Sequence, residues 1–243
     1  MPSLPDAVVL CGGAGTRLRS VTGAAPKSMA TVAGRPFLEL LLTQLSRSGF
    51  RRVVMAVGYQ KEVIREHFGP AFLGLQVVYS EESTPLGTGG ALGLAAPLLE
   101  TDLALVMNGD SYTDVDLGQF VTAHTASGSE ITLAVVPADG RTDCGSVFAD
   151  ATGTLSGFAE KLEGSGAPFI NAGIYLLPKS LLLKTPAGQQ FSLERELLPG
   201  WLKDGRSIRV FVGQNVCVDI GTPERFQAAQ QVLANAERNA AKP

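Results

Sequence analysis

Short apolar runs alternate with segments of helical periodicity in the first half of the chain. Residues 7–10, 53–57, 75–79 and 103–107 are the apolar runs, and each has the length and composition of a buried strand. The clearest helix covers residues 36–48, where Pro36 suits the first position and Gly49 ends the apolar stripe. A shorter helix is predicted over residues 60–68. This alternation predicts a mostly parallel sheet with helices on both faces.

The pattern changes after about residue 130, where strand-like runs follow one another at short spacing. They cover residues 131–136, 145–149, 155–159, 170–177, 208–211 and 216–218. Asp150-Ala151-Thr152-Gly153 has the composition of a hairpin turn, so the second half is expected to add antiparallel strands. A final helix is predicted over about 223–238, and residues 239–243 are expected to fray. The predicted fold class is α/β, with a three-layer, Rossmann-like mixed sheet.

Length and composition favour one domain. The 243 residues, of which 45% are hydrophobic, can bury a substantial core, and neither a linker nor an internal repeat is visible. We expect a single domain over 1–243, made of two halves at about 5–130 and about 131–225.

Charge and hydropathy exclude several classes of function. A formal net charge of −3 argues against a nucleic-acid partner, because surfaces that bind duplexes need an excess of Lys and Arg. No run approaches the roughly 18 apolar residues of a membrane span, and the first residues lack a secretory signal, so a cytoplasmic protein is expected. Cys11, Cys144 and Cys217 suggest neither disulfides nor zinc and are expected in the core. His67 and His124 lie near predicted helix ends, where surface or capping roles are expected rather than catalysis.

A glycine-rich turn follows the first strand-like run. Its sequence is Leu10-Cys11-Gly12-Gly13-Ala14-Gly15-Thr16-Arg17. Glycines let backbone N–H groups approach phosphate oxygens, and the carboxyl end of a strand is where open α/β sheets bind ligands. No Gly-Lys-Ser or Gly-Lys-Thr follows, and Leu18 stands where the dinucleotide fingerprint needs a small residue. The turn is therefore a candidate nucleotide site of another kind, or only a tight connection.

Further polar clusters each follow or end an apolar run. They are Pro26-Lys27, residues 85–90, Asn108-Gly109-Asp110, Glu160-Lys161, Asn171-Ala172-Gly173 and residues 218–221, which include Asp219. Taken singly, each has a plain structural reading: Asp110 as a loop cap, Lys27 as a solvated cation, Asn171 as a partner for strand-end backbone groups. Together they are expected to converge on one sheet edge, where two aspartates, several cations and glycines suit phosphate chemistry with a divalent metal.

These motifs, in this order from Leu10 to about Phe226, resemble the sugar-1-phosphate nucleotidyltransferases, which have a GT-A-like fold. The resemblance implies catalytic roles for Arg17, Lys27, Asp110, Lys161 and Asp219, with Asp110 and Asp219 holding Mg²⁺. It implies nucleotide binding by Leu10, Cys11, Gly12, Gly13, Gly15, Thr16, Arg17, Glu82, Gly87 and Thr88, and sugar-phosphate binding by Gly145, Glu160, Lys161, Asn171 and Gly173. Lys161 would hold the sugar 1-phosphate for in-line attack on the α-phosphorus. The resemblance thus makes residues 5–130 the nucleotide-binding half and residues 131–225 the sugar-phosphate-binding half.

The chain departs from this family at two positions. Ser28 and Leu162 stand where prolines are common, which changes loop stiffness rather than charge. The chain is also short for the family, so no carboxy-terminal regulatory or acyltransferase extension is expected.

Glu82 bears on the choice of base. It lies five residues before Gly87, about where the family reads the base, and a carboxylate can accept both N1–H and N2–H of guanine. Uracil and thymine, with one N–H between two carbonyls, suit glutamine better, so GTP is expected. Residues 21–27, 34–39 and 108–112 look most like the D-glycero-D-manno-heptose 1-phosphate guanylyltransferases, which implies GDP-heptose for bacterial surface polysaccharides.

Alternatives remain open at this level. One is a mannose 1-phosphate guanylyltransferase, and another a uridylyl- or thymidylyltransferase acting on a hexose 1-phosphate. A third, of a different class, is a catalytically silent homologue that binds a sugar nucleotide and regulates a partner. The sequence leaves the oligomeric state open, a homo-oligomer included.

Overall fold

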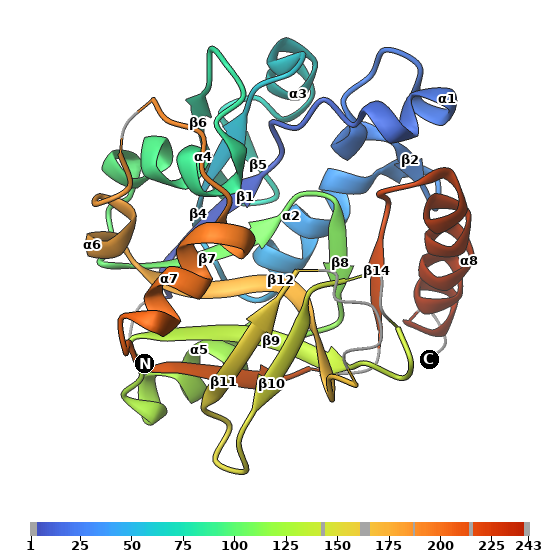
Figure 1. Cartoon of the computed structure of the whole chain (residues 1–243). Coiled ribbons are helices and arrows are strands. Elements are labelled where there is room, and N and C mark those ends of the chain that lie inside the picture. The colour runs from blue at the N-terminus through green and yellow to red at the C-terminus, as the bar shows by residue number, and fades with distance from the viewer. Residues whose placement is uncertain (1–3, 142–143, 161–165, 187, 214–215, 241–243) are drawn as a thin grey trace.

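A mixed sheet of ten strands forms the centre of the molecule (Figure 1). The computed structural model describes residues 4–141, 144–160, 166–186, 188–213 and 216–240. The parallel part consists of β7 (Leu103–Asn108), β1 (Asp6–Leu10), β4 (Arg52–Val57) and β6 (Leu75–Glu81), in that spatial order. After β1 the chain adds β4 and then β6 on one side of β1, and it later returns to add β7 on the other side. The direction of strand order therefore reverses at β1. Such a switch point opens a crevice at the carboxyl ends of the strands.

The second half of the chain adds antiparallel strands to the β7 side. β12 (Phe169–Pro178) pairs antiparallel with β7, with β9 (Ile131–Pro137) and with β10 (Ser146–Ala149). β11 (Leu155–Ala159) forms a hairpin with β10, and β13 (Ile208–Val212) runs parallel to β9. On the other edge, the short β5 (Ala71–Phe72) pairs with β6. The mixed, Rossmann-like sheet predicted from the sequence is confirmed.

Two hydrophobic cores lie on opposite faces of the sheet. Along β1, Ala7 and Val9 belong to one core while Val8 belongs to the other, because successive strand side chains point to opposite faces. The first core packs against α2 (Phe37–Arg47), α3 (Lys61–Phe68), α5 (Leu117–Ser127) and α8 (Pro223–Ala240). The second packs against α4 (Gly87–Ala95), η3 (Ala96–Leu98), α6 (Lys179–Leu182) and α7 (Leu198–Lys203). The result is the three-layer arrangement that the hydropathy pattern predicts.

Short elements complete the fold around the strand ends. Among the described residues, they include η1 (Thr16–Leu18), α1 (Arg19–Thr22), η2 (Lys27–Met29) and η4 (Leu193–Leu197), the last a π-helical turn. Two ribbons lie outside the main sheet: β2 (Thr31–Val32) with β3 (Arg35–Pro36), and β8 (Ser111–Thr113) with β14 (Cys217–Asp219). Within the described residues, no helix is long and apolar enough to cross a membrane.

Several predicted boundaries need correction. Pro36 belongs to β3 and caps α2 from outside, because its extended ψ of 136° precedes the first helical turn. Gln60 likewise precedes α3, in the left-handed region at φ 48°. At the other end of the chain, Asn239 and Ala240 are helical rather than frayed, and residues 241–243 lie outside the described part.

The expectation for His124 is wrong, because this residue is buried. Its Nδ1 lies 2.8 Å from Thr132 Oγ1, which in turn lies 3.2 Å from Ser129 Oγ. His67 matches the expectation, since its half-exposed ring contacts Glu39 Oε1 at 2.7 Å. Cys11 is buried, whereas Cys144 and Cys217 are only half-buried beside a small cluster around Val136, Ala138 and Ile170.

Burial of His124 predicts a loss of stability in acid. Desolvation holds the pKa of its imidazole below the ordinary value of 6.5, so the unfolded chain takes up a proton that the folded chain resists. Stability contributed by this site is therefore present above the ordinary pKa and declines as the pH falls below it. We expect the free energy of unfolding to fall between pH 7.5 and pH 5.5, and we expect His124→Gln to make that fall smaller. Denaturant unfolding at the two pH values measures it, and an equal fall in the variant contradicts the assignment.

Candidate active site

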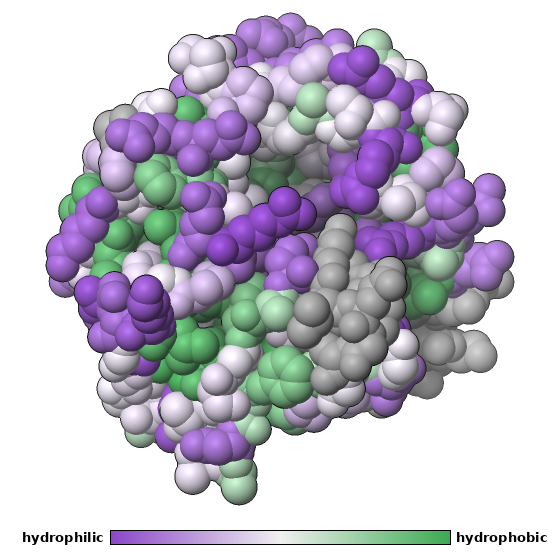
Figure 2. All heavy atoms as spheres, in the orientation of Figure 1, coloured by the Kyte–Doolittle hydropathy of each residue, from purple (hydrophilic) through white to green (hydrophobic). Residues whose placement is uncertain are grey.

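A cavity of about 670 Å³ lies at the carboxyl ends of β1, β4, β6 and β7, at the switch point of the sheet. In the space-filling view this face is hollowed at its centre, and hydrophilic residues line part of the rim (Figure 2). The lining residues are Leu10, Cys11, Gly12, Gly13, Ala14, Gly15, Thr16, Arg17, Lys27, Ser28, Ala56, Gly58, Tyr59, Glu82, Ser83, Thr84, Pro85, Gly87, Thr88, Ala91, Asn108, Gly109, Asp110, Gln190 and Gly221. Every residue predicted to bind the nucleotide is among them.

The glycine-rich turn forms one wall of this cavity. Gly15 caps η1 in the left-handed conformation, with φ 56°, and a Cβ there would lie 2.4 Å from the Cβ of Lys27. A Cβ on Gly12 would lie 2.6 Å from Glu82 Oε1. The turn therefore uses glycine so that it can pass close to two predicted functional side chains. Arg17, in η1, is exposed at the cavity.

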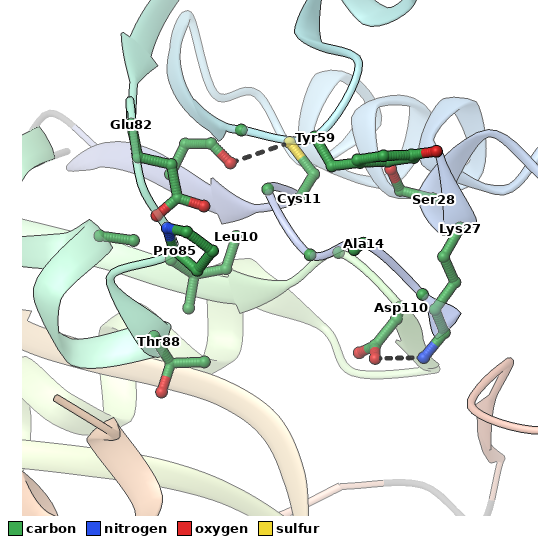
Figure 3. A pocket seen from close by; sticks show the side chains of 18 of the residues that line it. Leu10, Cys11, Ala14, Lys27, Ser28, Tyr59, Glu82, Pro85, Thr88 and Asp110 are labelled. Carbon is green, nitrogen blue, oxygen red and sulfur yellow. Dashed lines mark hydrogen bonds and ion pairs between the residues drawn. The ribbon is translucent and has the colours of Figure 1, made fainter. Parts of the chain in front are cut away.

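Lys27 and Asp110 form an ion pair at the phosphate end expected from the sequence (Figure 3). Lys27 Nζ donates to Asp110 Oδ2 at 2.6 Å, and the lysine side chain is only 12% exposed. Burial alone raises the pKa of the Asp110 carboxyl, but the charge and hydrogen bond of Lys27 outweigh burial and bring the pKa below its ordinary value. Asp110 is thus a carboxylate at neutral pH.

The ribbon of β8 and β14 brings Asp219 beside Asp110. In its antiparallel register Asp219 is opposite Ser111, and Ile220 N–H donates to the Asp110 carbonyl at 3.0 Å. Arg225, from α8, donates to both carboxylate oxygens of Asp219 at 3.1 and 3.0 Å. A Cβ built on Gly221 would lie 2.7 Å from Asp219 Oδ1 and 3.7 Å from Lys27 Nζ, so the lysine is near both carboxylates.

This pair of carboxylates fits a magnesium ion. Mg²⁺ is usually held by one or two carboxylates together with substrate phosphates, rather than by a complete protein cage. The described residues contain no cluster of three or more His, Cys, Asp or Glu that could hold a metal. Asp110 and Asp219 supply hard oxygen ligands, and Lys27 and Arg225 balance their charge.

Glu82 lies at the opposite end of the cavity from this cluster (Figure 3). Its Oε2 accepts the Leu86 N–H at 3.1 Å, and its Oε1 lies against the backbone of Gly12 and Gly58. Burial raises the pKa of the Glu82 carboxyl, a shift that the Leu86 hydrogen bond partly offsets. The carboxylate is held in place on one side by these backbone contacts.

Several cavity residues escaped the sequence analysis, and Gly58, Tyr59 and Gln190 are among them. Gly58 and Tyr59 follow β4, and Tyr59 N–H donates to the Gly12 carbonyl at 3.0 Å. A Cβ on Gly58 would lie 2.4 Å from Glu82 Oε1. Gln190 reaches the cavity from a segment 131 residues after Tyr59 in the chain. Gly58 and Tyr59 follow a predicted strand, a position that signals a ligand site in such sheets, whereas nothing local marks Gln190.

Gly87 is required by packing as well as by its expected role toward the base. It begins α4 at φ 68°, and a Cβ there would lie 2.4 Å from the Phe191 carbonyl oxygen. The same carbonyl accepts the Gly89 N–H at 2.9 Å, and Phe191 N–H donates to Leu86 O at 2.9 Å. The segment that carries Gln190 is therefore bound across the start of α4 through backbone atoms.

Gly87→Ala is expected to destabilise the fold by about 2 to 4 kcal/mol, because it combines positive φ with a backbone collision. Thermal or denaturant unfolding measures the loss. Gly74→Ala is the matched control: it has φ 80° and no atom within 4 Å of the built Cβ, so it reports the φ cost alone. Equal losses in the two variants would contradict the packing argument.

The described residues predicted to bind the sugar phosphate lie together, on the other side of Asn108 from the cavity. Asn171 N–H donates to the Gly145 carbonyl at 2.8 Å, and a Cβ on Gly145 would lie 3.1 Å from Glu160 Oε2. Gly173, with φ 72°, lies against the Asn108 amide. These residues do not line the large cavity, and Asn108 stands between the two regions. Lys161 falls outside the described residues.

Sequence comparison decides the family. The sequence profile of the family described as nucleotidyl transferase matches residues 6–236. The chain belongs to the nucleotidyl transferase family. The resemblance on which the site residues were predicted is therefore confirmed at this level.

Two relatives and one solved structure show which members of the nucleotidyl transferase family this chain resembles. The chain is 39% identical to mannose-1-phosphate guanylyltransferase of Mycobacterium tuberculosis over 91% of its own length, but spans only 62% of that protein. It is 36% identical to D-glycero-alpha-D-manno-heptose 1-phosphate guanylyltransferase of Campylobacter jejuni, over 91% of this chain and 96% of the relative. The crystal structure of HddC from Yersinia pseudotuberculosis complexed with GMP-PN superimposes with a TM-score of 0.81 at 32% identity, covering 95% of this chain and 100% of HddC.

Proposed function

We propose that this protein transfers the GMP group of GTP to a sugar 1-phosphate, which yields a GDP-sugar and pyrophosphate. The observation that carries the proposal is the layout of one cavity, which has a carboxylate able to accept guanine N–H groups at one end and the Lys27–Asp110 ion pair at the other. Asp219 ends β14, the partner strand of β8, next to that ion pair, since the N–H of Ile220 donates to the Asp110 carbonyl. The cavity volume of about 670 Å³ suits a nucleoside triphosphate. The relatives named above, which are guanylyltransferases, support the same reaction.

The chemistry needs positioning rather than a protein base. The attacking phosphate oxygen of the sugar 1-phosphate is ionised near neutral pH, since the second pKa of such a phosphate is about 6. Lys27 holds phosphate oxygens near the reacting phosphorus, and Arg17 with the backbone N–H groups of the glycine-rich turn stabilises the departing pyrophosphate. Asp110 and Asp219 hold Mg²⁺, which when bound supplies positive charge to the phosphates. Lys161 is assigned to the acceptor phosphate.

For the acceptor sugar we propose D-glycero-D-manno-heptose 1-phosphate. The chain aligns with 96% of the length of the Campylobacter jejuni relative, whose name gives heptose 1-phosphate as the acceptor. The product then serves bacterial capsule or lipopolysaccharide synthesis, and the reaction belongs in the cytoplasm, where GTP is available. Mannose 1-phosphate is the second candidate, because the mannose-specific relative has 39% identity.

Release of pyrophosphate tests the reaction directly. Purified protein with Mg²⁺ is supplied with GTP, ATP, CTP or UTP against heptose 1-phosphate, mannose 1-phosphate and glucose 1-phosphate. We expect GTP with heptose 1-phosphate to give the highest kcat/KM. If mannose 1-phosphate is the one sugar phosphate that supports turnover, the acceptor is mannose 1-phosphate. If the protein binds a nucleotide but turns over no substrate pair, a catalytically silent regulatory homologue is favoured.

A further inference from the structure

Glu194 is a carboxylate that the reaction proposed above does not use. It lies in η4, and among the described residues its hydrogen-bond donors are neutral side chains. Thr88 Oγ1 donates to Oε2 at 2.7 Å and Ser192 Oγ to the same oxygen at 3.4 Å, while Tyr175 OH and Asn108 Nδ2 reach Oε1 at 3.3 and 3.4 Å. None of the ion pairs among the described residues includes Glu194. Its charge is therefore stabilised by oriented hydroxyl and amide groups.

On the nucleotide side, the direction of the hydrogen bonds is determined by the backbone. Leu193 N–H donates to Thr88 Oγ1 at 2.7 Å. The hydroxyl oxygen is thus already an acceptor, so its own hydrogen is directed to Glu194. Thr88 lines the nucleotide cavity at the first turn of α4. Glu194 consequently determines the orientation of a hydroxyl that faces the predicted nucleotide.

On the sugar side, a second series of donors ends on the same carboxylate. Gly173 N–H donates to Asn171 Oδ1 at 3.1 Å, which determines which way the amide faces. Asn171 Nδ2 donates to Tyr175 OH at 2.6 Å, so the tyrosine hydrogen is directed to Glu194. Tyr175 is fully buried, and burial together with the charge of Glu194 keeps its pKa well above the ordinary value, so it remains a donor.

We propose that Glu194 is a positioning residue that couples the two substrate subsites, since it orients Thr88 on the nucleotide side and, through Tyr175, the Asn171 amide on the sugar side. The inference rests on the proposed function, which assigns those subsites. A carboxylate is needed because both donor series end on it, one on each oxygen. An amide offers one acceptor oxygen, so Glu194→Gln can satisfy only one of the two series.

Kinetics of Glu194→Gln test this role. We expect the KM for the sugar 1-phosphate, or the KM for GTP, to rise about tenfold, the usual effect of losing one hydrogen bond to a charged group. Glu196→Gln is the matched control, because it makes the same change of charge in the same helix. Among the described residues, the donor to the Glu196 carboxylate is the Ser192 N–H, at 2.7 Å, and an amide oxygen can accept that bond equally well.

A double-mutant cycle separates coupling from a merely structural role. Thr88→Val and Asn171→Ala are combined, and kcat/KM is measured for GTP and the sugar 1-phosphate. We expect the two effects to be non-additive in the wild-type background and additive in the Glu194→Gln background. Additivity in both backgrounds, or kinetics of Glu194→Gln equal to those of Glu196→Gln, would overturn the proposal.

The network is also tested without turnover. Thermal unfolding of Thr88→Val, Tyr175→Phe and the double variant gives a coupling between the two side chains that needs no substrate. We expect a measurable coupling that disappears with Glu194→Gln, and its absence would overturn the network itself. If the coupling is present but the wild-type protein releases no pyrophosphate with any substrate pair, the proposed function fails while the network stands.

Discussion

Loss of either aspartate at the phosphate end is expected to reduce kcat at least a thousandfold. In Asp110→Asn and Asp219→Asn the side chain keeps its size and an oxygen, but the charge that binds a divalent cation is lost. Asp219 Oδ1 accepts the Gly221 N–H at 2.8 Å, a bond that an asparagine oxygen can also accept. The fold is therefore expected to persist, and the loss reports the charge.

The alanine variants are less informative, because they also disturb the fold. Asp110→Ala leaves the ammonium group of Lys27, which is only 12% exposed, without the carboxylate that balances it. We therefore expect a loss of stability in that variant in addition to the loss of turnover.

Two further measurements separate the metal role from a structural one. Mn²⁺ binding, followed by water proton relaxation in the presence of GTP, should weaken in both asparagine variants. The melting temperature should fall less in these variants than in the alanine variants, because the asparagine oxygen still accepts a hydrogen bond. Asp114→Asn serves as the control, since Asp114 is an exposed carboxylate that follows β8 on the same ribbon. Turnover near the wild-type rate in Asp110→Asn or Asp219→Asn would refute the metal assignment.

Glu82→Gln is expected to lower the preference for GTP over UTP about a hundredfold. A carboxylate accepts both N–H groups of the guanine edge, whereas an amide presents one donor and one acceptor and suits the uracil edge better. The side chain is already aligned, because Leu86 N–H holds one oxygen and the glycines at positions 12 and 58 leave room for the other. The ratio of kcat/KM for GTP and UTP measures the change.

Glu81→Gln is the matched control for this prediction. Glu81 is the neighbouring carboxylate, but it is exposed and pairs with Lys61 and Arg65 instead of lining the cavity. Base preference should not change in that variant. A Glu82→Gln protein that kept the wild-type GTP preference would show that the base is read elsewhere.

The same assignment predicts a pH dependence. Burial raises the pKa of Glu82, so its carboxylate is protonated at a higher pH than that of an exposed glutamate. A protonated carboxyl cannot accept both guanine N–H groups, so kcat/KM for GTP should fall as the pH is lowered through this raised pKa. The profile for Glu82→Gln should lack that step.

Local patterns were sufficient to predict the architecture and the family. Alternating runs on β1, β4, β6 and β7 predicted the parallel half of the sheet, because a buried strand and an amphipathic helix each have a periodicity set by backbone geometry. The polar clusters follow those strands directly, so their meeting at one sheet edge could be predicted from chain order. All the residues predicted to bind the nucleotide line a single cavity for that reason.

The predictions that failed depend on interactions between distant segments. His124 is polar and near a helix end, yet it is buried, because Thr132 on β9 supplies its hydrogen bond. Pro36 precedes α2 rather than opening it, because pairing of β3 with β2 keeps its backbone extended. In each case the contact that decides the outcome comes from a strand, and that strand lies outside the helix to which the sequence pattern assigned His124 or Pro36.

The sequence by itself determined the mixed α/β fold, the family and the order of the motifs, because each is encoded in short stretches of residues. Only the tertiary structure decided what joins those motifs. The β8 and β14 ribbon brings Asp219 to Asp110, and the Phe191 carbonyl explains why Gly87 must be glycine. The same segment carries Glu194 to Thr88, more than a hundred residues away. Contacts across such distances leave no periodic signal in the sequence, because they depend on how separate elements pack.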